Sequence, residues 1–372
     1  MVAPRRIAIL GVTGSIGQSA IEVMRAHPDR FQVVLASAHT GSDALEALRS
    51  EMHIPHTVIT SADDGKKRLL GLVRSLDYDI LLNAVAGSAG LEYTFAAIEC
   101  GRDVALANKE SLVLAGHLVA PLQRQTGASL LPVDSEHSAI MQALGNTPAD
   151  QVRRLILTAS GGPFRELPFN DFEGITVAQT LAHPTWDMGA KITVDSATMM
   201  NKALEVIEAH WLFGVGFDRI DAVIHPQSVV HSVVETVDGS MLAQMGVPSM
   251  RLPILYALGW PHRVPSTAVQ TSLLDLPPLT FAPLERDRYP LFFTAIEAGR
   301  QGGLLPTVAN AANEAAIRLF LDGRIRFIDI ARLVEVVLRR SDNEPQPSLE
   351  MIVDTNKEVF ARVMADYALL LA

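Results

Sequence analysis

The alternation of short apolar runs with helical stretches constrains the fold of this chain most strongly. Between most of the apolar runs lie stretches with a helical pattern, such as Gln18–Ala26 and Leu91–Cys100. Strands that alternate with helices form a parallel, doubly wound sheet, which binds its ligands at the carboxyl ends of its strands. The sequence therefore predicts a Rossmann-like N-terminal domain. The predicted strands are 6–10, 31–36, 79–85, 103–107 and 128–133, and the residues at their carboxyl ends are Gly11, His39, Gly87, Asn108 and Asp134.

Glycines recur at every third position in the turn after the first predicted strand, at Gly11, Gly14 and Gly17. Such a turn lets the backbone approach a pyrophosphate, which the positive end of the following helix attracts. A purely structural turn can have the same spacing. The glycine turn of this chain follows the first strand of an alternating pattern, however, and this position favours dinucleotide binding. After the second strand the chain reads His39-Thr40-Gly41, with neither an acidic residue for the ribose of NAD nor a basic one for the extra phosphate of NADP.

Two carboxylates, Asp134 and Glu136, follow the last apolar run of this domain in "LPVDSEHS". If they continue the strand, they point to the same side and repel each other unless a cation lies between them. The alternatives are a metal site and a strand that simply ends in solvent.

The pattern changes after residue 151, where the runs predict a mixed or antiparallel sheet with a hairpin at Asp238-Gly239. Six prolines between 261 and 290 predict an extended connection, and only helical patterns follow it, at 311–321, 328–339 and 348–370. The predicted fold class is α/β. The predicted domains are 1–134 (Rossmann-like), 135–260 (central α+β and catalytic), 261–290 (linker) and 291–372 (helical).

A long helix predicted over 197–213 has a polar start, capped by Asp195 or Ser196. Asn201 and Glu205 share one face of it, and with Lys202 and the capping serine they could bind a phosphate. The alternative, a solvated polar face, has equal weight. Two Gly- and Pro-rich loops, 157–164 with Ser160 and 183–191 with His183 and Trp186, are candidates for substrate contacts. The second is either a lid that closes over a substrate and excludes water or a loop that packs its own tryptophan on the core.

Composition narrows the possible partners. The net charge is −10 and no basic stripe occurs, which disfavours nucleic acid and anionic membranes. The single cysteine, Cys100, permits no intrachain disulfide and is predicted to lie in the core. The chain contains no apolar run long enough for a transmembrane helix or a signal peptide, so a cytoplasmic protein is expected.

Seven segments in the same order resemble the 1-deoxy-D-xylulose 5-phosphate reductoisomerase family. They are GVTGSIGQ, ALANKESLV, LPVDSEHSAI, LTASGGPF, HPTWDMGAKITVDSATMMNKALEVIEAHWLF, IHPQSVVHSVVETVDGS and NAANEAA. The resemblance implies an NADPH-dependent rearrangement and reduction of 1-deoxy-D-xylulose 5-phosphate to 2-C-methyl-D-erythritol 4-phosphate, an early step of non-mevalonate isoprenoid synthesis. It also implies a homodimer.

The resemblance assigns roles to individual residues. One Mg or Mn ion is bound by Asp134, Glu136 and Glu205, which are catalytic together with Lys109. Substrate contacts come from these glutamates, from Lys109 and Ser135 near the reacting carbons, and from a phosphate and lid set: Ser160, His183, Trp186, Gly189, Ser196, Asn201 and Lys202. NADPH contacts come from Thr13, Gly14, Ser15, Ile16, His39, Thr40, Gly41, Asn108, Glu110 and Gly189. At 39–41 the lysine often present in the family is missing, so a weaker preference for NADPH is expected.

Two other functions fit parts of the sequence. A semialdehyde dehydrogenase shares the glycine turn but needs a cysteine nucleophile, for which only Cys100 is available. A dinucleotide-sensing regulator would need neither the three carboxylates nor the Ser-Asn-Lys set.

Overall fold

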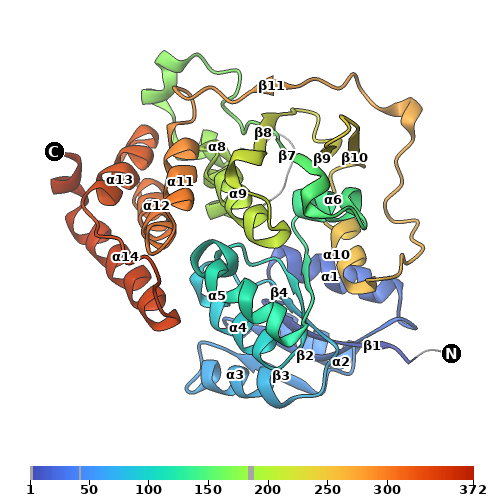
Figure 1. Cartoon of the computed structure of the whole chain (residues 1–372). Coiled ribbons are helices and arrows are strands. Elements are labelled where there is room, and N and C mark those ends of the chain that lie inside the picture. Colours follow the sequence, from blue (N-terminus) through green and yellow to red (C-terminus); the bar gives the residue numbers. More distant parts are fainter. Residues whose placement is uncertain (1–2, 42, 183–187) are drawn as a thin grey trace. The chain divides into compact units, whose positions relative to one another are not determined.

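A computed structural model describes residues 3–41, 43–182 and 188–372 of the chain (Figure 1). The chain folds into two compact units. The first unit contains the chain up to Ser111, Gly116–Gln142 and Ser249–Ser272, and the second contains Leu112–Ala115, Ala143–Pro248 and Leu273–Ala372. The mixed α/β class predicted from the sequence is confirmed, with a parallel sheet, a second sheet and a helical C-terminal region.

The first unit is a parallel sheet with helices between its strands. Its strands are β1 (Arg5–Leu10), β2 (Phe31–Ala38), β3 (His56–Ile59), β4 (Ile80–Asn83), β5 (Asp103–Leu106) and β6 (Leu130–Pro132). Its helices are α1 (Ser15–Ala26), α2 (Asp43–Glu51), α3 (Gly65–Ser75), α4 (Leu91–Glu99), most of α5 (Glu110–Thr126), nearly all of α6 (Ser135–Leu144) and α10 (Arg251–Gly259).

The strand order β3-β2-β1-β4-β5-β6, with every pair parallel, is that of the dinucleotide-binding fold. Side chains of α1, α2 and α10 form one core with the strands, and α1 and α10 lie side by side (Figure 1). The five predicted strands are all present. β3 was not predicted, because four residues, of which only Val58 is fully buried, leave too short a pattern to detect.

The second unit contains a mixed sheet. Its strands are β7 (Val152–Ala159), β8 (Ile220–Ile224), β9 (Val230–Thr236), β10 (Met241–Met245) and β11 (Ala282–Pro283), in the order β10-β9-β7-β8-β11. The hairpin at Asp238-Gly239 joins antiparallel β9 and β10, as predicted, and Gly239 has a φ of 87°. Two residues of the proline-rich segment form β11, which pairs with β8.

The second unit also contains several helices. They are α7 (Val177–Leu181), α8 (Ala190–Ala197), α9 (Met200–Phe213), α11 (Pro290–Gln301), α12 (Leu305–Leu321), α13 (Phe327–Arg339) and α14 (Leu349–Leu371). The last three pack against one another at the C-terminal end of the chain (Figure 1). Among the described helices, none has the length and hydropathy to span a membrane.

The prediction that Cys100 lies in the core is wrong, because its side chain is exposed. It follows the last turn of α4, and Gly101 (φ 68°) then turns the chain toward β5. A helix end of this kind lies at the surface, where a small residue need not pack.

Candidate functional site

The glycine turn after β1 requires glycine at two positions. Gly11 has a φ of 80°, and a Cβ there would lie 2.6 Å from the carbonyl oxygen of Ala84. A Cβ at Gly17 would lie 2.4 Å from the carbonyl oxygen of Gly11. Gly14 precedes the first turn of α1, and the predicted contacts Thr13, Gly14 and Ser15 are exposed. The first helix thus begins with accessible backbone N–H groups, which suit a pyrophosphate.

The end of β2 is open to solvent. His39, Thr40 and Gly41 are exposed, and the His39 ring lies 3.2 Å from the hydroxyl of Thr60. The His39 and Thr40 side chains provide hydrogen-bonding groups beside the position that the adenosine of a dinucleotide takes in this fold.

Asn108 is almost fully buried and connects two loops at the carboxyl edge of the sheet. Its amide nitrogen lies 2.8 Å from the carbonyls of Val85 and Gly87 and 2.9 Å from the carboxylate of Glu110. Its side-chain oxygen accepts from the backbone and hydroxyl of Ser111. Asn108 and Glu110 therefore hold the shape of the loops after β4 and β5.

Lys109 and Asp134 form an ion pair beside the carboxyl end of β6. Both side chains are largely buried, with exposed fractions of 13% and 14%. The hydroxyl of Ser135 donates to the carboxylate of Glu136. Carboxylate oxygens of Asp134 and Glu136 lie within 4.8 Å of each other, so the structure brings these two predicted ligands together.

Asp134 and Glu136 do not continue the strand. β6 ends at Pro132, and the carbonyl of Asp134 accepts the N–H of Ser138, which begins α6. Asp134 is thus at the start of the helix and Glu136 in its first turn. The positive end of the helix stabilises both negative charges.

Glu205, the third predicted ligand, lies on α9 in the second unit and is 1% exposed. Its carboxylate forms an ion pair with Lys202 and accepts a hydrogen bond of 2.5 Å from Asn201. The predicted shared face of Asn201 and Glu205 is therefore present. The predicted cap is wrong, because Asp195 and Ser196 lie in α8 and Met199, with a φ of 61°, separates α8 from α9.

Ser160 and Ser196, two predicted phosphate contacts, lie on segments that pack closely together. Ser160 follows β7, and its loop continues through Gly162. A Cβ at Gly162 would lie 2.8 Å from the carbonyl oxygen of Ser196, so only glycine permits this approach. Asn201 and Lys202 are in the first turn of α9, which begins at Met200, three residues after the last residue of α8. The second unit thus carries two hydroxyls, an amide and a lysine on the loop after β7 and on the consecutive helices α8 and α9.

The lid prediction falls mainly on residues outside the described part of the chain. His183 and Trp186 are among these residues. Gly189 is described, and it is an exposed residue directly before α8.

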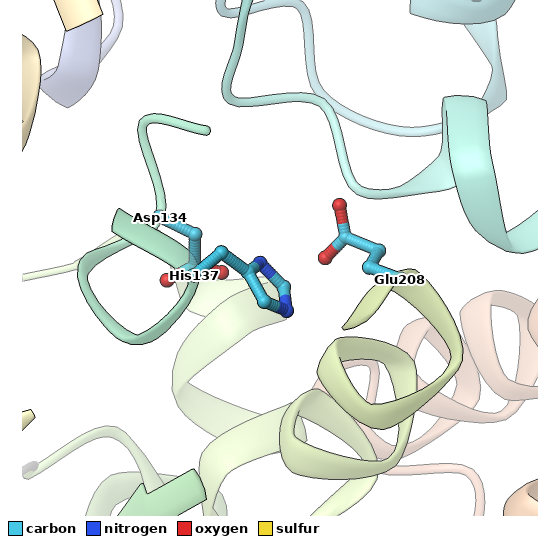
Figure 2. Close-up of side chains that lie close together, drawn as sticks. All are labelled: Asp134, His137 and Glu208. Carbon is cyan, nitrogen blue, oxygen red and sulfur yellow. The ribbon is translucent and has the colours of Figure 1, made fainter. Parts of the chain in front are cut away.

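Sequence reasoning passed over two buried side chains, His137 and Glu208. Figure 2 shows Asp134 and His137 close together at the start of α6, with ligand atoms within 4.8 Å, and Glu208 on α9. His137 is 1% and Glu208 3% exposed. Their spacing in the sequence could have indicated them. His137 follows Asp134 by three residues and Glu208 follows Glu205 by three, and residues three apart lie on the same face of a helix.

Models of known families match most of the chain. The model described as 1-deoxy-D-xylulose 5-phosphate reductoisomerase matches residues 7–74 and 60–116, and two models of the C-terminal domains of that enzyme match 130–213 and 245–362.

Curated proteins and solved structures agree with this match. 1-Deoxy-D-xylulose 5-phosphate reductoisomerase of Leifsonia xyli is 48% identical, with 97% of this chain and 98% of the relative covered. The Synechococcus enzyme is 47% identical, with 94% of each covered. The Zymomonas mobilis enzyme in complex with NADPH superimposes with a TM-score of 0.92, at 39% identity and 99% coverage of both chains. A reductoisomerase in complex with NADPH, fosmidomycin and magnesium gives 0.91, at 37% identity, covering 98% of this chain and 99% of that one. The resemblance seen in the sequence motifs is thus confirmed, and the chain belongs to the 1-deoxy-D-xylulose 5-phosphate reductoisomerase family.

Proposed function

We propose that this protein rearranges and reduces 1-deoxy-D-xylulose 5-phosphate to 2-C-methyl-D-erythritol 4-phosphate, with NADPH and a divalent cation. Membership of the family carries the proposal. The arrangement of polar groups within each unit supports it, because two carboxylates lie close together at one edge of the parallel sheet, and hydroxyl, amide and lysine side chains that suit a phosphate lie on or beside α8 and α9.

The cation is proposed to bind Asp134, Glu136 and Glu205. Asp134 and Glu136 fit this role, since their oxygens lie within 4.8 Å of each other and oxygen donors suit a hard ion such as Mg or Mn. A bound cation polarises a substrate carbonyl and stabilises developing negative charge. Lys109, paired with Asp134, lowers the repulsion between the two carboxylates and provides a proton donor beside them.

The substrate phosphate is proposed to bind Ser160, Ser196, Asn201 and Lys202, with His183, Trp186 and Gly189 closing over the substrate. Ser160 and Ser196 offer hydroxyls on packed segments, and Lys202 offers a positive charge at the start of α9. Such contacts would hold the substrate by its phosphate, which is remote from the reacting carbons. The binding energy of the phosphate then helps to position those carbons.

NADPH is proposed to bind along the carboxyl edge of the parallel sheet and to supply the hydride. Its pyrophosphate would lie against Thr13, Gly14, Ser15 and Ile16, and its adenosine near His39, Thr40 and Gly41. Asn108 and Glu110 support the neighbouring loops through their buried hydrogen bonds. Gly189 would approach the cofactor from the lid.

We further propose that the protein is a cytoplasmic homodimer. Its domains are proposed to be those predicted from the sequence: 1–134, 135–260, 261–290 and 291–372. Exposed apolar side chains on β10 support the dimer. Met241, Leu242 and Met245 are 60%, 44% and 38% exposed, and β10 is an edge strand of its sheet within the described residues. An apolar edge strand is a surface that a second copy can cover.

The proposed reaction is tested by following NADPH oxidation with 1-deoxy-D-xylulose 5-phosphate. Turnover is expected with Mg, is lost in EDTA and returns when Mg is added in excess. Cys100→Ala should leave turnover unchanged, since Cys100 is exposed at the end of α4. Loss of activity in this variant would favour a dehydrogenase with a cysteine nucleophile. NADPH binding without turnover would favour a regulator.

A further inference from the structure

The loop that carries Ser160 depends on anchors outside itself. Gly161 and Gly162 follow Ser160 with φ values of +83° and +69°. Two consecutive glycines adopt these angles without strain, but they also leave the loop with large conformational freedom. Something else must therefore select one conformation.

Tyr289 and Arg288 provide these anchors from the start of α11. The Tyr289 hydroxyl is buried and donates to the carbonyl of Gly161 at 3.0 Å. Burial raises the pKa of Tyr289 to about 12, so the phenol stays protonated and remains a donor at neutral pH. Arg288 donates to the carbonyls of Phe164 and Leu167, at 2.9 and 2.8 Å, and holds the far end of the loop.

A single peptide group connects Tyr289 to Ser160. The carbonyl of Gly161 and the N–H of Gly162 belong to the same planar peptide, so they turn together. The carbonyl accepts from Tyr289, and the N–H donates to the hydroxyl oxygen of Ser160 at 3.2 Å. Fixing one end of this peptide therefore fixes the direction of the other.

We propose that Tyr289 is a positioning residue for substrate phosphate, because its hydroxyl orients the Gly161–Gly162 peptide and through it the hydroxyl of Ser160. Tyr289 touches neither substrate nor cofactor in this role. The inference rests on the proposed function, in which Ser160 binds the phosphate.

Tyr289→Phe removes only the hydroxyl and tests the inference. We expect KM for 1-deoxy-D-xylulose 5-phosphate to rise roughly tenfold, the effect of about one lost hydrogen bond, while kcat changes less than about threefold. KM for NADPH should not change. The matched control is Tyr78→Phe, which removes another buried tyrosine-to-carbonyl hydrogen bond, of 2.8 Å to Val73, in the first unit. It should lower stability comparably without raising the substrate KM.

A double-mutant cycle with Ser160→Ala separates positioning from a general loss of structure. If Tyr289 acts through Ser160, Tyr289→Phe should raise KM no further once Ser160 is alanine. An equal tenfold rise in both backgrounds would overturn the inference, as would an unchanged KM in the single variant.

A second measurement does not need turnover. Inorganic phosphate should raise the melting temperature of the wild type, and Tyr289→Phe should need a higher phosphate concentration for the same rise. If the wild type does not turn over the substrate, the proposed function fails, while this titration still tests Tyr289. Equal titrations of the wild type and Tyr289→Phe would contradict its role.

Discussion

At the scale of single residues, a lysine accompanies a proposed metal ligand in each unit. Lys109 pairs with Asp134, and Lys202 pairs with Glu205. Buried carboxylates are costly unless their charge is balanced. The lysines therefore stabilise the two carboxylates before a cation binds. Lys109 also lowers the repulsion between the charges of Asp134 and Glu136.

Glu205→Gln tests the proposed metal ligand. The amide keeps the size of the side chain but removes its charge, so we expect turnover to fall more than the ~10–100-fold typical of residues that only support a ligand. The Mg concentration needed for half-maximal turnover should also rise, as a titration of activity with Mg would measure. Excess Mn should restore part of the loss.

Glu235→Gln is the control for this variant. Glu235 is also a buried carboxylate of the second unit, paired with Arg153 at 2.9 Å and with Arg154, but it lies on β9 and has no proposed metal role. It should lower stability and leave the Mg dependence as in the wild type. A Glu205→Gln enzyme with normal Mg dependence would remove Glu205 from the metal site.

Thr40→Lys should widen the preference for NADPH over NADH. Thr40 is exposed after β2, and a lysine there could form a charge-assisted hydrogen bond to the 2′-phosphate. We expect the ratio of kcat/KM values for the two cofactors to increase roughly tenfold or more, from the ~1.5–3 kcal/mol of a hydrogen bond to a charged group. Gln32→Lys adds the same charge near the amino end of β2 and should leave the ratio unchanged. A smaller ratio in Thr40→Lys would show that the cofactor lies elsewhere.

Within the candidate site, the sequence predicted the spacing along a helix better than the boundaries of the elements. Asn201 and Glu205 share a face because helical spacing alone decides this, and the structure has their hydrogen bond. Asp134 and Glu136 were considered as a continuation of the strand, because "LPVDSEHS" does not show that β6 ends at Pro132 and that α6 begins at Ser135. The boundary between such a strand and such a helix depends on hydrogen bonds that only the folded chain forms.

At the scale of elements, the break between α8 and α9 shows what local patterns miss. Residues 190–213 contain neither glycine nor proline, so nothing in the sequence marks a helix break near Met199. Met199 nevertheless adopts a φ of 61° and is 2% exposed. Such a conformation is unfavourable for methionine and persists only where tertiary packing fixes it. The break therefore could not be read from propensity.

The start of α13 allows a prediction on pH. Burial tends to raise the pKa of Asp329, but hydrogen bonds from the side chain and backbone of Arg326 and the charges of Arg326 and Arg332 outweigh it, so the net pKa lies below the usual 3.8. A lowered pKa means that the ionised carboxylate stabilises the fold above the unfolded pKa and loses this effect as the pH falls through the folded pKa.

Asp329→Asn should therefore lower the free energy of unfolding by about 0.5–2 kcal/mol at pH 7, the range for lost helix caps. The difference from the wild type should shrink as the pH falls below 3.8, as urea unfolding over a pH series would show. Asp354→Asn is a control at an exposed carboxylate of α14, paired only with Lys357 in the described structure, and should have little effect. A difference that is independent of pH would contradict the assigned role of the Asp329 charge.

At the scale of the whole molecule, contacts between distant parts of the chain set the limits of prediction. The alternating pattern was sufficient for the parallel sheet, because each strand and helix has its own local signal. Helix α10 joins the core of that sheet from residues 251–259, far along the chain from β6 at 130–132. No local pattern indicates which core a helix will join, so this assignment required the structure.

The apolar edge strand β10 leads to a prediction on assembly. Met241 and Leu242 are neighbours and point to opposite faces of the strand, and both are substantially exposed. A lone chain gains nothing from apolar groups on both faces of an edge, where most proteins place charges or prolines. Pairing with a second copy would satisfy the free backbone edge and cover both faces at once.

Met241→Lys combined with Leu242→Glu should therefore convert the proposed dimer to a monomer, because dimerisation would then bury charges on both faces of the strand. Light scattering after gel filtration should give twice the chain mass of 40.2 kDa for the wild type and the single chain mass for the variant. Leu369→Lys, at a 72% exposed position on α14, is the control and should remain dimeric. Circular dichroism of the double variant must match that of the wild type, so that loss of the dimer is not loss of the fold. A folded double variant that remains dimeric would exclude β10 from the interface, and a wild type of single chain mass would exclude the dimer itself.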